Sequence, residues 1–327
     1  MGEETAGSSR RKVVVVGAGA VGSTFCYALA QSGLADEIAL IDRNEDLVRG
    51  QVLDLAHGQP FFPTVDIRLG PVEDFARAQV VVIAAGTAQR PGESRLDLLQ
   101  RNAAIVTGIV DQVVAQNSQA VLLLVSNPVD PLTWVALERS GWPRGRVIGS
   151  GTVLDSARLR HLLSRHCAVD VHNVHAYVLG EHGDSEFVAW SLAHIAGMPL
   201  AEYCGVCGRC SGWAAERSRL EQEVRNSAYH IIGYKGATCL AVGLALVRIV
   251  GAILRGQRSV LSVSVRLDGE FGLRDVCLSV PCVVSDRGVE LILQAALPEA
   301  EQQALAASAA LLRHALDQLP GKTAAAS

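Results

Sequence analysis

The sequence predicts an α/β fold in which a doubly wound parallel sheet is followed by an α+β second domain. Short apolar runs alternate with helical patterns along the first half of the chain. The runs cover residues 13–16, 37–41, 80–84 and 120–125, and the helical patterns cover residues 22–31, 46–55 and 96–117. Apolar runs of this length are typical of strands buried on both faces of a parallel sheet. Their alternation with helices therefore predicts a doubly wound domain.

The pattern changes after about residue 150, where helical segments are mixed with alternating runs. Helices are expected at residues 155–166, 213–232 and 238–254 and after residue 298, and strands at residues 174–179, 259–265 and 275–284. This mixture predicts an α+β region with some antiparallel sheet. We therefore divide the chain into a disordered tail (1–12), a Rossmann-like doubly wound domain (13–150) and a second domain (151–327).

The composition is that of an ordinary globular protein. Of the 327 residues, 49% are hydrophobic, and the formal net charge is −4. That charge offers nothing global to attract nucleic acid or an anionic membrane, so neither is expected as a partner. The most apolar stretch, residues 237–254, carries Arg248 and is interpreted as a buried helix. No secretory signal is recognised, and the eight cysteines are expected to be reduced thiols in the cytoplasm.

A glycine-rich turn follows the first apolar run. Residues 17–22 read GAGAVG and lead directly into a helical pattern. Gly17 permits the tight turn, Gly19 lets the backbone approach a pyrophosphate, and Gly22 lets helix and strand pack closely. Asp42 follows the second apolar run, where its carboxylate can bind the adenosine ribose and would repel a 2′-phosphate. We therefore expect an NAD site formed by Gly17, Gly19, Ala20, Val21, Gly22 and Asp42.

A histidine and an Asp–Arg pair supply the chemistry of alcohol–carbonyl interconversion. His182 lies between glycines in residues 180–185 (GEHGDS), and histidine exchanges protons near neutral pH. Asp155 and Arg158 are three positions apart at a helix start, so they share one face. Such an acid can orient an imidazole, while the arginine can grip a carboxylate through two hydrogen bonds. Taken alone, each motif would also fit a structural loop or a surface ion pair.

Two further loops follow strands at the carboxyl edge of the expected sheet. Residues 86–97 (GTAQRPGESRLD) form a glycine- and proline-containing loop of the kind that closes over a substrate. Residues 126–130 (SNPVD) end the next strand at the same edge. Open α/β sheets bind their ligands there, so the loops predict a ligand site.

The histidine motif, the Asp–Arg pair and the two loops resemble, in order and spacing, motifs of the lactate/malate dehydrogenase family. The likeness covers nearly the whole chain. The resemblance implies hydride transfer between NAD and a small 2-oxo acid. It implies that His182 protonates the carbonyl oxygen during reduction and that Asp155 holds the imidazole. It further implies that Arg158 binds the substrate carboxylate and that Arg95 arrives with the closing loop to polarise the carbonyl.

The far end of the substrate is expected to meet the residue six positions before Arg95, which is Gln89. Family members that act on malate place an arginine there, whereas glutamine is neutral and packs against a methyl group. A second carboxylate left uncompensated would cost about 3–5 kcal/mol. Together with a pocket threonine, Thr238, this favours pyruvate and lactate as substrates. Malate and larger 2-hydroxy acids remain alternatives, because Arg90 is adjacent and a neutral pocket discriminates single methylenes weakly.

The resemblance also implies contacts outside the reacting centre. Gly86 and Asn127 match cofactor-binding positions, and Asn127 is expected to help place the substrate oxygen as well. Arg160 and His175 match positions that bind fructose 1,6-bisphosphate between subunits in many bacterial members that act on lactate. An arginine with a titratable histidine suits phosphate. A solvated helix residue and a structural strand histidine are an equally good interpretation of this thin motif.

Three cysteines, Cys204, Cys207 and Cys210, depart from the family pattern and give two overlapping C-x-x-C spacings. Zinc and iron–sulfur sites normally need four ligands, and no fourth Cys or His is close in sequence, so no metal is expected. We interpret the cysteines as surface-loop thiols, with a redox-sensing NAD-binding protein as a distant alternative. The complete set of chemical residues favours an enzyme, and the resemblance suggests a homotetramer or a dimer in equilibrium with one.

Overall fold

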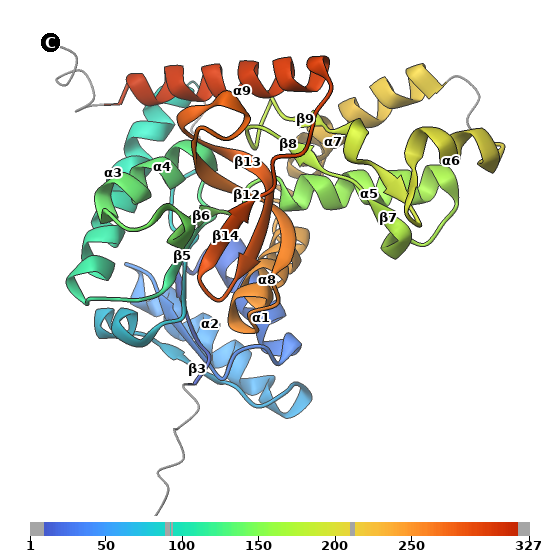
Figure 1. Ribbon diagram of the computed structural model, residues 1–327. Helices are drawn as coiled ribbons and strands as arrows, with labels where there is room; N and C mark the ends of the chain where they lie inside the picture. The colour runs from blue at the N-terminus through green and yellow to red at the C-terminus, as the bar shows by residue number, and fades with distance from the viewer. Residues whose placement is uncertain (1–9, 89–91, 93, 210–212, 320–327) are drawn as a thin grey trace, which may run out of the picture.

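The computed structural model describes residues 10–88, 92, 94–209 and 213–319. Within these residues, one nine-stranded sheet lies at the centre of the molecule with helices around it (Figure 1). Its strand order is β14-β13-β12-β6-β5-β4-β1-β2-β3. The strands from β6 to β3 are parallel to one another, so the predicted fold class is confirmed.

The parallel strands coincide with the four predicted apolar runs to within one residue and add two more. They are β1 (Lys12–Val16), β2 (Glu37–Ile41), β3 (Asp66–Leu69), β4 (Val80–Ile83), β5 (Val121–Leu124) and β6 (Val147–Gly149). The sequence did not indicate β3, whose apolar pattern is interrupted by charges, or β6, which is only three residues long. Residues 1–9 of the predicted tail lie outside the described residues, and β1 begins inside the segment expected to be disordered.

Alternating side chains of the parallel strands pack into two separate apolar cores. In β1 the odd-numbered valines face one core and the even-numbered valines face the other. The first core is closed by α1 (Ala20–Ser32), α2 (Glu45–His57) and α8 (Leu240–Leu254), and the second by α3 (Arg95–Ala115) and α4 (Val129–Ser140). Burial on both faces explains why these strands read as uninterrupted apolar runs.

The antiparallel strands of the second half extend the same sheet. They are β12 (Ser259–Asp268), β13 (Arg274–Ser285) and β14 (Gly288–Ile292). β12 joins β6 at one register position, where Ser264 lies opposite Gly149. Sequence periodicity predicts that a segment is a strand but not which edge it joins, so this connection was not foreseen. The two halves of the chain are therefore joined by a continuous sheet.

The remaining elements surround the site described below. The short strands are β7 (Val174–His175), β8 (Val178–Leu179), β9 (Phe187–Val188), β10 (His194–Ile195) and β11 (Met198–Pro199). The helices are α5 (Val153–Cys167), α6 (Leu200–Cys207), α7 (Trp213–Lys235) and α9 (Glu299–Asp317). In the part of the chain that the structure describes, no helix has the length and apolar character to cross a membrane.

Two predictions about the second half are wrong in detail. The strand expected at residues 174–179 is two short strands, because β7 pairs with β10 whereas β8 pairs with β9. The cysteine segment expected as a surface loop is instead helical as far as Cys207. Leu200 and Cys204, four positions apart, both pack against an apolar cluster, which gives α6 its buried face. Cys210 lies outside the described residues.

Four charged side chains, of which Lys12 and Asp74 are buried, form a group between β1, β2, β3 and the turn that follows β3. The Lys12 side chain, only 4% exposed, donates to Asp74 and lies 3.2 Å from a carboxylate oxygen of Glu37. Arg68 donates to Asp74 at 2.6 Å and also pairs with Glu37. Burial opposes ionisation, but the hydrogen bonds from Arg68 and Lys12 outweigh it and lower the pKa of Asp74. The stabilisation is therefore present at neutral pH and lost on acidification.

We expect Lys12→Met to lower the free energy of unfolding by about 3 kcal/mol, because it leaves two buried carboxylates with one cation fewer. Urea unfolding at neutral pH measures the change. Arg49→Met is the matched control, since the Arg49–Glu45 pair has both side chains more than 60% exposed and should contribute less than about 1 kcal/mol. Equal losses in the two variants would contradict the role given to burial.

Candidate active site

The glycine-rich turn between β1 and α1 has the shape that a bound pyrophosphate requires. Gly17 has a φ of 113°, and a Cβ there would lie 2.6 Å from the backbone nitrogen of Ala85. A Cβ on Gly22 would lie 1.8 Å from the carbonyl oxygen of Gly17. Both positions therefore require glycine. At Gly19 a Cβ would meet nothing within 4 Å, so this side of the turn is open to a ligand.

The start of α1 offers backbone donors to a phosphate. Gly19 is the N-cap and has no capping side chain, and the amides of residues 20–22 precede the first intrahelical hydrogen bond. The Asp42 carboxylate lies at the same turn, where it accepts the N–H of Ala18 at 2.8 Å. Free amides at a helix start suit a pyrophosphate, and a carboxylate beside them suits an unmodified ribose. The predicted cofactor residues of this turn therefore fit NAD.

A buried asparagine joins the two loops at the carboxyl edge of the sheet. Asn102, 1% exposed on α3, accepts the N–H of Thr87 at 2.9 Å and donates to the carbonyl oxygen of Asn127 at 2.7 Å. Gly86 and Asn127 thus belong to neighbouring loops, and both are exposed at this edge. Sequence reasoning did not identify Asn102, because its helical position gives no sign of its two loop partners.

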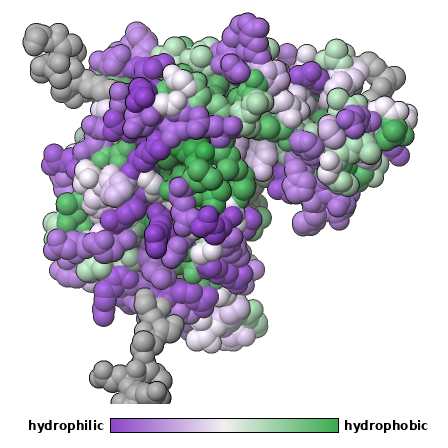
Figure 2. Space-filling model, in the orientation of Figure 1, coloured by the Kyte–Doolittle hydropathy of each residue, from purple (hydrophilic) through white to green (hydrophobic). Residues whose placement is uncertain are grey.

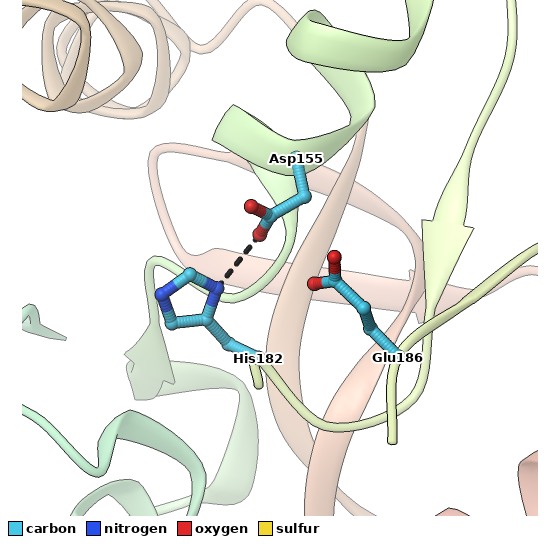
Figure 3. Close-up of side chains that lie close together, drawn as sticks. All are labelled: Asp155, His182 and Glu186. Carbon is cyan, nitrogen blue, oxygen red and sulfur yellow. Dashed lines mark hydrogen bonds and ion pairs between the residues drawn. The ribbon is translucent and has the colours of Figure 1, made fainter. Parts of the chain in front are cut away.

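One buried carboxylate holds both of the groups predicted to contact substrate. Asp155, 1% exposed at the start of α5, lies 2.7 Å from Nδ1 of His182 (Figure 3). It also accepts a hydrogen bond from Nη1 of Arg158 at 2.5 Å. The other ring nitrogen of His182 points away from Asp155 (Figure 3). The structure therefore brings the Asp155–Arg158 pair together with His182, which the sequence placed in a separate motif.

The charge of this group is set by its pairing. Burial alone would lower the pKa of His182, but the Asp155 carboxylate outweighs it and raises that pKa to about 9. Burial would likewise raise the pKa of Asp155, yet the attraction of His182 and Arg158 lowers it. Asp155 is therefore an anion that stabilises a protonated imidazole.

Two side chains that sequence reasoning missed hold the backbone of the His182 loop. Asp130 accepts the N–H of His182 at 2.7 Å and is 1% exposed, and burial raises its pKa to about 6. Ser308 of α9 accepts the N–H of Glu181 at 2.8 Å. Asp130 ends the SNPVD motif, which was a signal for it, whereas nothing in the local sequence points to Ser308. The loop is therefore fixed by segments from both halves of the chain.

The predicted carbonyl-polarising residue, Arg95, lies at the mouth of this group. It begins α3 and pairs with Asp184, two positions after His182. Tyr229 of α7 donates to the other oxygen of Asp184 at 2.8 Å. The side chains of Arg95 and Asp184 are 67% and 55% exposed, so water weakens their attraction and Arg95 can exchange partners at low cost.

Two residues, Gln89 and Thr238, are predicted to contact the far end of the substrate. Gln89 lies outside the described residues. Thr238 is half-buried two positions before α8, and Cys239, at the N-cap of that helix, lies between them. Only Thr238 is therefore located by the structure.

A third carboxyl group lies beside the Asp155–His182 pair. Glu186 comes from the segment after the GEHGDS motif and is 5% exposed. One ligand atom from each of Asp155, His182 and Glu186 lies within 4.8 Å of the others, a spacing that a metal ion can bridge. Asp155 already has Arg158 and His182 as cationic partners, and their positive charges would repel a metal ion at this position.

The predicted effector residues line a separate cavity of about 730 Å³. Arg160 donates Nε to the carbonyl oxygen of Val174 at 2.7 Å, and His175 is exposed on β7. Arg248 and His172 line the same cavity and add further cationic or titratable groups. Arg160 therefore makes a structural hydrogen bond and also lines a basic cavity.

An NAD-binding turn on one sheet edge, combined with a proton-exchanging histidine beside an arginine, defines the class of NAD-dependent dehydrogenases. Residues 11–149 match the NAD binding domain of lactate/malate dehydrogenase, and residues 152–322 match the alpha/beta C-terminal domain of the same family. The chain belongs to the lactate/malate dehydrogenase family and is an NAD-dependent oxidoreductase.

Similar proteins cover almost the whole chain. L-lactate dehydrogenase from Treponema denticola is 58% identical over 312 residues, which are 95% of this chain and 98% of the relative. The structure of MGS-M5, a lactate dehydrogenase enzyme from a Medee basin deep-sea metagenome library, has a TM-score of 0.92 at 41% identity and covers 95% of this chain and 99% of its own. The minor L-lactate dehydrogenase from Enterococcus mundtii in its ligands-bound form has a TM-score of 0.92 at 39% identity. The match covers 96% of this chain and 100% of that structure's chain.

We expect Asp155→Asn to lower the pKa of His182 from about 9 to below its ordinary value of 6.5, because burial remains while the stabilising carboxylate is lost. An NMR titration of the histidine ring measures the shift. Asp170→Asn is the control. Among the described histidines, the one that hydrogen-bonds to Asp170 is His172, which is exposed and lies outside the site. A His182 titration that is the same in wild type and Asp155→Asn would contradict the assignment.

Proposed function

We propose that the protein catalyses the reversible reduction of pyruvate to L-lactate with NADH. The observation that carries this proposal is the double pairing of Asp155, which holds a proton-carrying imidazole and a guanidinium within one buried group. A 2-oxo acid needs both, because its carbonyl oxygen takes up a proton while its carboxylate needs a cation. The names of the relatives support the same substrate pair.

NADH supplies the hydride when it is bound at the glycine-rich turn and the sheet edge. His182 carries the proton at Nε2, since Nδ1 is engaged by Asp155, and donates it to the substrate carbonyl oxygen. Asp155 stabilises the protonated imidazole and keeps the ring from rotating. In the direction of lactate oxidation, the neutral ring removes the hydroxyl proton, so the same nitrogen serves both directions.

The remaining roles concern substrate binding and charge. Arg158 binds the carboxylate of the substrate through its guanidinium fork. Arg95 leaves Asp184 and moves to the carbonyl oxygen, where negative charge develops during reduction. Asn127 supplies a polar contact at the sheet edge, and Thr238 lines the pocket for the methyl group. Oxidation of malate or of larger 2-hydroxy acids is the second candidate function, because both substrate classes use the same proton and hydride chemistry.

A regulatory site for fructose 1,6-bisphosphate is part of the proposal. Arg160, His172, His175 and Arg248 line one cavity, and such a cluster suits a doubly phosphorylated sugar. The cavity also borders α8, where Leu244 is 65% exposed. Phosphates bound there would act on the helix that follows Thr238, which gives a physical route to the substrate pocket.

We also propose a homotetramer that works in the cytoplasm. Figure 2 shows hydrophobic residues gathered in the middle of one face, in an otherwise largely hydrophilic surface. Among the described residues, exposed apolar side chains occur on the antiparallel strands and on α8, including Val260, Leu291, Leu240 and Leu244. Exposed apolar area of this kind is typical of subunit contacts. Free thiols at Cys26, Cys239, Cys277 and Cys282 suit a reducing compartment.

The substrate assignment predicts that kcat/KM for pyruvate exceeds that for oxaloacetate by at least about a hundredfold, because Gln89 cannot neutralise a second carboxylate. Initial rates of NADH oxidation measure the ratio. Gln89→Arg should move the preference toward oxaloacetate, whereas Arg90→Gln should leave the pyruvate preference in place. If Arg90→Gln changed the ratio and Gln89→Arg did not, residue 90 would be the one that contacts the far end of the substrate. A wild-type preference for oxaloacetate would overturn the pyruvate assignment.

The effector assignment predicts that fructose 1,6-bisphosphate lowers the KM for pyruvate by about 5-fold or more, the usual range of allosteric coupling. Arg160→Gln should lose this response, because the cavity loses a phosphate-binding cation. Arg165→Gln, on the same helix but outside the cavity lining, should respond like the wild type. An unchanged KM and an unchanged oligomeric state at saturating effector would contradict the proposal.

A further inference from the structure

Glu186 is a buried carboxyl group for which the mechanism above has no use. Its residue is 5% exposed, and its side chain points into the space beside His182 and Asp155 (Figure 3). No described side chain or backbone group makes a hydrogen bond or ion pair with its carboxyl oxygens. A carboxyl group that is largely removed from water and has no cationic partner of its own favours its neutral form.

The neighbouring charges determine which carboxyl group keeps its proton. Asp155 has two direct cationic partners, Arg158 and His182, and therefore stays ionised. Glu186 has no such partner, and two adjacent buried carboxylates repel each other. Burial first, and Asp155 second, raise the pKa of Glu186 to about 8. At neutral pH, Glu186 is therefore a neutral acid beside an anionic Asp155.

The charged groups with the largest effect on the pKa of Glu186 come from three segments. Helix α5 supplies Asp155 and Arg158, the GEHGDS loop supplies His182, and α7 supplies Arg225. Arg225 donates Nε to the backbone carbonyl of Glu186 at 3.2 Å, so it is attached to the backbone and not to the carboxyl group. The positive charge of Arg158 is therefore shared among Asp155, the substrate carboxylate and, once ionised, Glu186.

We propose that Glu186 is a positioning residue whose protonation state sets the affinity for the substrate carboxylate. The neutral side chain leaves the charge of Arg158 to the substrate. The ionised side chain competes for that charge and repels the incoming carboxylate. This inference rests on the proposed function, because it takes Arg158 to be the carboxylate clamp. It adds a residue that controls when the clamp is available.

Lactate oxidation separates the effect of Glu186 from that of His182. Oxidation needs a neutral His182, so loss of the imidazole proton raises the rate and cannot cause a fall at high pH. Ionisation of Glu186 has the opposite effect, because it weakens lactate binding. The two groups titrate in the same range, and the wild type should give a bell-shaped profile of kcat/KM for lactate. Pyruvate reduction is uninformative here, because both ionisations lower its rate.

The test compares wild type, Glu186→Gln and Glu186→Asp with lactate and NAD between pH 6 and 10. In the wild type, kcat/KM at pH 10 should lie about tenfold below its maximum, through KM and not kcat. In Glu186→Gln the alkaline fall should disappear, because the side chain cannot ionise. In Glu186→Asp it should return. An alkaline fall of equal size in Glu186→Gln, or its absence from the wild type, would overturn the proposal.

Thermal unfolding gives a second measurement that does not depend on activity. The unfolded chain releases the Glu186 proton near pH 4.5, whereas the folded chain keeps it to about pH 8. The contribution of the Glu186 proton to the stability of the wild type is therefore lost as pH rises through this window. The Tm of Glu186→Gln relative to wild type should rise from pH 5 to pH 8 and then level off. A constant Tm difference would overturn the buried neutral acid, whereas absence of any lactate turnover in wild type would overturn the proposed function alone.

Discussion

The carboxylate of Asp155 is the group on which the rest of the site depends. It is almost fully buried, and an isolated charge in that position would be expensive. Its two oxygens offset the cost by binding His182 and Arg158, one each. The proton-exchanging group and the carboxylate-binding group are therefore held as one rigid unit, set by the first turn of α5. Disturbing either pair changes both the charge of the site and its geometry.

The parts of the structure that could be predicted from sequence are those with a local cause. The strands of the parallel sheet are buried on both faces, which leaves continuous apolar runs such as β1 and β2. The turn at Gly17 and Gly22 is fixed by steric limits on the backbone itself, so its glycines identify it directly. The spacing of Asp155 and Arg158 on one helix face likewise appears in the sequence. These local signals sufficed to locate the cofactor turn and the reacting groups.

The features that escaped prediction depend on contacts between distant segments. Ser308 and Asp130 accept backbone N–H groups of the His182 loop, and although Asp130 ends the SNPVD motif, nothing in the local sequence links either residue to that loop. Glu186 looks like an ordinary acid in a polar segment, and only its burial beside Asp155 distinguishes it. The pairing of β12 with β6 was equally hidden, because alternation shows that a strand exists but not what it pairs with.

The contact between α9 and the His182 loop has a consequence for how the protein is made. Translation proceeds from the N-terminus, so the glycine-rich turn leaves the ribosome long before the helix that carries Ser308. The loop that holds His182 lacks one of the two side chains that accept its backbone N–H groups until α9 has been synthesised. A chain that ends before α9 therefore lacks this brace of the reaction centre.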